Sequence, residues 1–212
     1  MPTKRNQTSI NESYLIVNGL VGASHNSKAA NLLLKVQPQL DHFDYLSPSK
    51  YFREVWGIVS SHKLYSSSIS GETFELLFAC ILLREGISPF YMQAELTFVP
   101  DSHFDFIIYT KEIGPIALSL KTSLRERYKQ AELESISLRN VHRLSRSFLL
   151  TLNKSEAIKL QNKVNSGDLI AIEQVILADT IQLDRFIAQI KKYTPIKAPK
   201  VETINSGSFI KI

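Results

Sequence analysis

The stretch from Glu72 to Lys121 constrains the fold most strongly, because its hydrophobic pattern changes period there. From Glu72 to Arg84 the residues are apolar on almost every side of a helix, which indicates a buried helix that Gly86 ends. Three β-type runs separated by turn residues follow, at Glu95–Val99, Phe104–Thr110 and Ile116–Lys121. This order predicts a helix packed against an antiparallel meander.

Helical patterns fill most of the remaining chain. They predict helices over 29–36, 49–60, 125–138, 154–165 and 183–193, with one more strand over 174–178. Helices that alternate with strands in this way predict an α/β fold with a mixed central β-sheet flanked by helices. No linker divides the chain, so we expect one domain over 1–212, with loosely held ends at 1–12 and 200–212 and a core at about 70–180.

Composition narrows the class of partner and compartment. The formal net charge of +5 favours an anionic partner such as nucleic acid. Cys80 is the single cysteine, which excludes an intramolecular disulfide and a multi-thiolate zinc site. The longest apolar run, FELLFACILL, is about half the length of a membrane helix. We therefore expect a soluble, cytoplasmic protein that does not interact with membranes.

A carboxylate and a lysine on neighbouring predicted strands form the candidate site. Asp105 is embedded among apolar residues, where a lone buried charge is costly without a compensating cation. The short connection KEIGP predicts a hairpin that brings Asp105 near Lys121, at the end of the next strand. A carboxylate that holds Mg²⁺ and a lysine that orients water are the minimum for metal-assisted phosphodiester hydrolysis.

Further carboxylates are candidates for the same site. The residue two before Lys121 is Ser119, a poor magnesium ligand, so we expect Glu134 from the following helix to supply the second ligand beside Asp105. Glu75 is the preferred additional residue, because its helix has almost no polar face. Glu72 and Asp101 remain the alternatives to Glu75 and Asp105.

These residues together resemble the PD-(D/E)XK nuclease superfamily. In particular, Ser119-Leu120-Lys121 with Glu134 downstream looks like the type II restriction endonucleases related to EcoRII and NgoMIV, which recognise CCGG or CC and GG around a central base. That group replaces the usual acidic residue before the lysine by a small one and takes a glutamate from the next helix instead. The resemblance covers about Glu72 to Glu134 and implies a restriction-endonuclease-like core.

The same group carries an Arg-(Asp/Glu)-Arg element, matched here by Arg125, Glu126 and Arg127. Arginine can form two hydrogen bonds with guanine and a carboxylate can accept one from cytosine, so this element at a helix start could read G·C pairs. Between residues 121 and 146 there are seven Lys or Arg and three Glu, which places positive charge beside the candidate site. Arg53 and Trp56 are candidates to hold a flipped base, although a core position is the better interpretation of Trp56.

The resemblance implies a Mg²⁺-dependent endonuclease that cuts both strands of a palindromic DNA site and leaves 5′-phosphate ends. It also implies a homodimer, a bacterial or archaeal host and a cognate DNA methyltransferase. Two other functions stay open, namely a nuclease of the same superfamily in DNA repair or junction resolution, and a non-catalytic DNA-binding protein. The terminal helices are candidates for the dimer interface.

Overall fold

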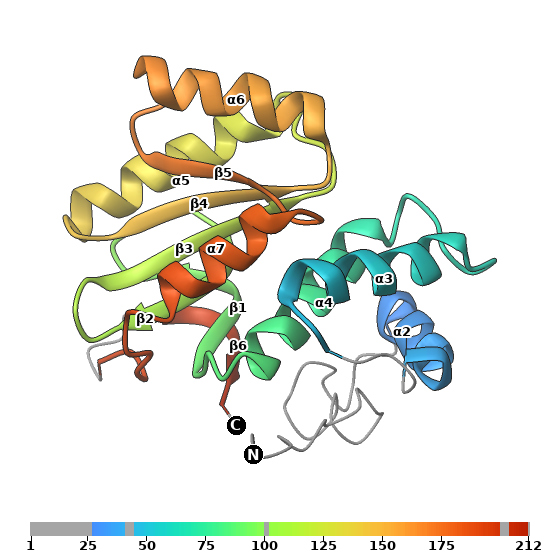
Figure 1. The fold of residues 1–212 in the computed structure, drawn as a ribbon. Coiled ribbons are helices and arrows are strands. Elements are labelled where there is room, and N and C mark those ends of the chain that lie inside the picture. The colour runs from blue at the N-terminus through green and yellow to red at the C-terminus, as the bar shows by residue number, and fades with distance from the viewer. Residues whose placement is uncertain (1–26, 41–44, 100–101, 200–203, 212) are drawn as a thin grey trace, which may run out of the picture.

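The computed structural model describes residues 27–40, 45–99, 102–199 and 204–211. Within these ranges six helices surround one six-stranded sheet (Figure 1). The helices are α2 (Lys28–Leu40), α3 (Pro48–Ser61), α4 (Ser70–Arg84), α5 (Arg127–Val141), α6 (Lys154–Ser166) and α7 (Ile181–Ile190). The strands are β1 (Phe90–Leu96), β2 (Phe104–Thr110), β3 (Gly114–Lys121), β4 (Arg146–Thr151), β5 (Ile172–Leu177) and β6 (Ile204–Ile210).

The sheet is mixed, with strand order β5-β4-β3-β2-β1-β6. Strands β1, β2 and β3 are antiparallel neighbours, which confirms the predicted meander. Strand β4 pairs parallel with β3, and β5 pairs parallel with β4, because α5 and α6 provide the crossover connections that parallel strands need. The predicted α/β class with a mixed central sheet is therefore confirmed.

Strand β3 shows how the two faces of the sheet differ. Ile116, Leu118 and Leu120 face the larger core, which also contains apolar side chains of α2, α3, α4 and α7. The alternate residues point to the opposite face, where α5 packs against β3 and β4. Because Ser119 and Lys121 have this second parity, they lie on the side of the sheet that α5 covers.

The described elements differ from the sequence-based expectation both in their boundaries and in two strands that were not expected. The first strand is Phe90–Leu96 rather than Glu95–Val99, because Thr97 to Val99 form a turn in which Phe98 has a φ of 70°. Strand β4 was not predicted at all. Helix α5 begins at Arg127 rather than Arg125, and the expected loose end at 200–212 is wrong for β6, which pairs with β1. The expected loose end at 1–12 lies outside the described residues.

Helices in the described part of the chain are too short or too polar to cross a membrane.

Several of the helices begin at the capping residues that local sequence favours. The side chain of Ser47 accepts a hydrogen bond from the Lys50 amide at the start of α3, and the side chain of Asn153 accepts one from the Glu156 amide at the start of α6.

Candidate active site

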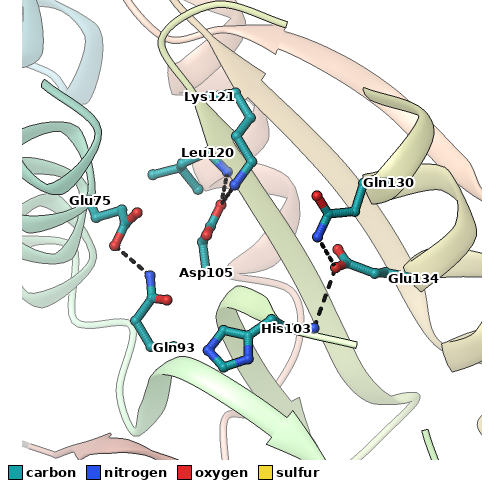
Figure 2. A network of polar contacts seen from close by, with 8 residues as sticks. All are labelled: Glu75, Gln93, His103, Asp105, Leu120, Lys121, Gln130 and Glu134. Atoms are coloured by element: carbon teal, nitrogen blue, oxygen red, sulfur yellow. Dashed lines mark hydrogen bonds and ion pairs between the residues drawn. The ribbon is translucent and has the colours of Figure 1, made fainter. Parts of the chain in front are cut away.

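The centre of the site is an ion pair between neighbouring strands of the hairpin (Figure 2). The Nζ atom of Lys121 lies 2.8 Å from Oδ2 of Asp105, and the backbone N–H of Leu120 donates to the same oxygen at 2.6 Å. The β2–β3 register, continued by one residue beyond Phe106↔Leu118, puts Asp105 opposite Ser119. The short hairpin therefore brings Asp105 and Lys121 together, as the sequence predicted. Asp105 is only 7% exposed, so water solvates its charge poorly, and Lys121 compensates that charge instead.

Glu75 approaches this pair from α4. Its Oε2 accepts a hydrogen bond of 2.6 Å from Nε2 of Gln93, on β1. Burial raises the pKa of Glu75 from 4.5 to about 7, and the negative charge of Asp105 adds to the shift, while Gln93 and Lys121 oppose it. Glu75 is thus a carboxyl group that exchanges a proton near neutral pH.

Glu134 lies on the other side of Asp105 from Glu75 and belongs to α5 (Figure 2). It is 7% exposed, and its Oε1 accepts hydrogen bonds from Nε2 of Gln130 at 2.9 Å and from the backbone N–H of His103 at 3.4 Å. Burial is the main cause that raises the pKa of Glu134, with a smaller contribution from Asp105 and an opposing one from Lys121. The structure therefore brings together all four residues predicted for catalysis.

Asp105 and Glu134 are the two carboxylates of this site that could hold a metal ion. Within the described ranges, no three His, Cys, Asp or Glu side chains are grouped closely enough to enclose a metal ion. Mg²⁺ usually takes one or two carboxylates and completes its shell with water and substrate phosphate. Asp105 and Glu134 could serve as such a pair, and both of them interact with the charge of Lys121.

A pocket of about 470 Å³ opens beside the ion pair. Lys121 and Glu75 line it together with Arg125 and Arg127. Another wall is formed by Ser67 and Ser68 in the turn before α4 and by Ser70 and Gly71 at the start of α4. Arg125 and Arg127 are exposed, and Arg125 has a left-handed backbone with a φ of 30°. The predicted recognition arginines thus share one cavity with two of the predicted catalytic residues, Lys121 and Glu75.

Glu126 differs from its two neighbours. It precedes the first residue of α5, it is exposed, and it forms an ion pair with Lys129 one turn later. Its side chain does not line the pocket that holds Arg125 and Arg127. One of its two carboxylate oxygens, Oε2, is thus engaged by Lys129 outside that pocket.

A further carboxylate, Glu156, supports the loop that carries the arginines. Its Oε2 accepts a hydrogen bond of 2.6 Å from the backbone N–H of Leu124, and both of its oxygens lie 3.4 Å from Oγ of Ser123. Glu156 lies in the first turn of α6, a long way along the sequence, so no local pattern could connect it with the site. Gln93 was missed for the same reason, whereas Gln130 lies only four residues before Glu134 on α5, so helical spacing could have found it.

Comparison with known proteins adds one likeness. No protein-family model matches the chain, and no curated protein matches it. A solved structure described as "Restriction endonuclease PspGI-substrate DNA complex" is similar, with 20% identity, a TM-score of 0.49, and coverage of 82% of this chain and 83% of that chain.

The remaining candidates from the sequence lie elsewhere. Glu72 is exposed, one turn before Glu75, and Asp101 lies outside the described residues. Arg53 donates through Nε and Nη2 to the backbone oxygen of Asp179. Trp56 packs against the rings of Phe52, Phe74 and Tyr65, which favours its interpretation as a core residue.

Proposed function

We propose that this protein is a Mg²⁺-dependent type II restriction endonuclease that makes double-strand cuts in DNA at a palindromic site containing CC and GG. The observation that carries the proposal is the Asp105–Lys121 ion pair, flanked by carboxylates from two different helices and open to a pocket with two arginines. Phosphodiester hydrolysis needs ligands for a metal, a group that orients water and cations for the phosphates, and these residues supply each of them.

Each residue of the cluster has a defined part in this chemistry. Asp105 and Glu134 would hold Mg²⁺, which when bound offsets the negative charge that builds up on the phosphate. Lys121 would orient the attacking water through its ammonium group, which Asp105 holds in place, and its positive charge would make that water easier to deprotonate. Glu75 supports the cluster from α4, where its raised pKa lets it accept or return a proton near pH 7. The products would be a 5′-phosphate and a 3′-hydroxyl.

Base recognition belongs to the arginines of the same pocket. The guanidinium groups of Arg125 and Arg127 can each donate two hydrogen bonds to O6 and N7 of a guanine in the major groove. Glu126 would accept a hydrogen bond from N4 of a cytosine once DNA displaces its contact with Lys129. Because the recognition and cutting groups are so close, the bases that are read would lie next to the bond that is cut.

A palindromic site fits a homodimer in which each protomer reads one half-site and cuts one strand. Such an enzyme would work in the cytoplasm of a bacterium or archaeon, beside a DNA methyltransferase that protects the host sequence. The homodimer, the host compartment and the methyltransferase are expectations that follow from the proposed activity and not from contacts within this chain.

Digestion of a fully sequenced plasmid in Mg²⁺, with sequencing of every fragment end, tests the proposal. We expect discrete ends at one motif containing CC and GG. Lys121→Ala should abolish cutting, and Arg127→Ala should abolish it at that motif. Lys159→Ala, which removes an exposed lysine of α6 outside the pocket, should cut like the wild type.

Other outcomes of the digestion distinguish the rival functions. Ends without a common sequence, lost in Lys121→Ala, would identify a nuclease with a repair or junction-resolving role. DNA binding in Ca²⁺ without any cutting in Mg²⁺ would identify a non-catalytic DNA-binding protein. Cutting that survives Lys121→Ala would refute the catalytic assignment.

A further inference from the structure

Strand β1 contains a backbone conformation that glutamine rarely adopts. Gln93 has a φ of 48°, in the left-handed region that favours glycine, although it lies inside a strand. Residues other than glycine keep this conformation only where their surroundings enforce it, and such positions gather at functional sites. The environment of Gln93 therefore calls for an explanation.

A β-bulge between β1 and β6 enforces the conformation. Met92 pairs with Ser208 and Glu95 pairs with Ser206, so Gln93 and Ala94 together lie opposite the single residue Gly207. Gly207 has a φ of 133°, and a Cβ atom at this position would lie 2.9 Å from the backbone oxygen of Met92. The bulge thus depends on a glycine that lets β6 approach β1 closely.

On its other side, β1 keeps a regular register with β2. Met92 pairs with Phe106 and Ala94 pairs with Phe104, which leaves Gln93 opposite Asp105. The extra residue of a bulge re-aims its side chain. In this protein the re-aimed side chain of Gln93 reaches Glu75 on α4, and Nε2 donates to Oε2 at 2.6 Å (Figure 2). Gln93 thus stands beside one carboxylate of the site and holds another.

We propose that Gln93 is a positioning residue that fixes the Glu75 carboxylate toward Asp105 and Lys121, and that the bulge opposite Gly207 exists to aim it. The role of Glu75 in cutting rests on the proposed function, whereas the contact between Gln93 and Glu75 does not. Glu75 is partly buried on a helix, and a single strong donor restricts which way its carboxylate turns.

Gln93→Asn is the decisive variant. Asparagine tolerates a left-handed backbone, so the bulge should persist, but its side chain is one methylene shorter and does not reach Glu75. The single-turnover cleavage rate should fall about 10- to 100-fold, and the affinity for the same duplex in Ca²⁺ should not change. A fall in DNA affinity that accounts for the whole loss would overturn the positioning role.

Phe98→Asn is the matched control. Phe98 also has a left-handed backbone, with a φ of 70°, and it is exposed in the turn after β1. The control also places asparagine at a position with a left-handed backbone, but it does not affect the contact with Glu75. The Phe98→Asn protein should therefore cut like the wild type. Equal losses in Gln93→Asn and Phe98→Asn would mean that the turn geometry matters and the Gln93 side chain does not, which would overturn the inference.

A second measurement separates failure of this inference from failure of the proposed function. The measurement compares ¹⁵N-resolved NMR spectra of the wild type and of Glu75→Ala. The side-chain amide resonances of Gln93 should differ between the two, because the substitution removes their hydrogen-bond acceptor. If the wild-type protein cuts no DNA, the proposed function fails, and this spectrum alone decides whether Gln93 holds Glu75. Resonances that stay in place would refute the contact.

Discussion

Replacing Glu75 by Gln should make the protein more stable while it removes a group from the proposed active site. Glutamine has nearly the same shape, and its carbonyl oxygen can still accept the hydrogen bond from Gln93. The substitution removes only the ability to ionise. Because burial and the charge of Asp105 oppose ionisation of Glu75, the folded state should gain from the change wherever the wild-type residue is charged.

The size of the gain follows from the raised pKa. The pKa of this carboxyl group is 4.5 in the unfolded chain and about 7 in the folded protein. The unfolding free energy of the protein therefore falls by about 3 kcal/mol as pH rises from the first value to the second. The folded state binds the proton more tightly, so this stability is present below pH 4.5 and is lost as pH rises through 7. In metal-free buffer we expect Glu75→Gln to raise the unfolding free energy by about 1–3 kcal/mol at pH 8 and by less than about 1 kcal/mol at pH 5.

Urea denaturation followed by circular dichroism at both pH values, in the presence of EDTA, measures this difference. Glu72→Gln is the matched control, because it changes an exposed glutamate one turn earlier on α4 and should have a small effect at either pH. A Glu75→Gln protein that is less stable than the wild type, or a gain that does not change between pH 5 and pH 8, would refute the proposed environment of Glu75.

Three further substitutions test other parts of the structure. The carboxylate of Glu132 accepts hydrogen bonds from the backbone N–H groups of Ile170, Ala171 and Ile172, so Glu132→Ala should lower the unfolding free energy by about 2–5 kcal/mol. Leu133→Ala, which changes an exposed neighbour, is the control and should have a small effect. An equally small effect of Glu132→Ala would contradict the prediction. Glu156→Ala should release the loop at Ser123 and Leu124 and weaken duplex binding in Ca²⁺, measured by fluorescence anisotropy, and unchanged binding would show that the loop holds itself. Arg125→Ala should weaken binding of the cognate duplex by about 1–3 kcal/mol. Arg185→Ala, which removes an exposed arginine of α7, should not, and equal losses would point to a general charge effect.

The parts of the fold that sequence predicts well are those with a strong local period. The whole of β2 and the end of β3 at Lys121 follow from short apolar runs between turns, and the alternation along β3 indicates which face carries Lys121. Helix α4 is equally clear because it is apolar all round and Gly86 follows it. These elements suffice to predict that Asp105 and Lys121 meet.

Two strands escaped prediction for opposite physical reasons. Strand β4, RSFLLT, is buried between two parallel neighbours, and a short apolar run of this kind cannot be told from a piece of buried helix by period alone. Strand β6, INSGSFI, is polar and contains Gly207, so its own residues do not favour a strand. Its pairing with β1 creates it, and that pairing joins segments far apart in the sequence.

The same distinction applies to the candidate site. The proximity of Asp105 and Lys121 could be predicted from the strand pattern, and Glu75 stands out as a charge in an apolar helix. Glu134 lies on a polar helix and could be connected with them only through the resemblance to a known pattern. Gln93 could not be predicted, since its role arises from a bulge that depends on β6. Glu156 could not either, because a carboxylate in the first turn of a helix is ordinarily explained by the helix itself.

Cleavage of a supercoiled plasmid by wild-type protein and by Asp105→Asn, each in Mg²⁺ and in EDTA, tests the central claim most directly. Asp105→Asn keeps the shape of the side chain but removes the charge that pairs with Lys121 and would hold the metal. We predict linear product from the wild type in Mg²⁺ alone and none from Asp105→Asn under either condition. Linear product from Asp105→Asn in Mg²⁺, or from the wild type in EDTA, would contradict a metal-dependent site built on Asp105 and Lys121.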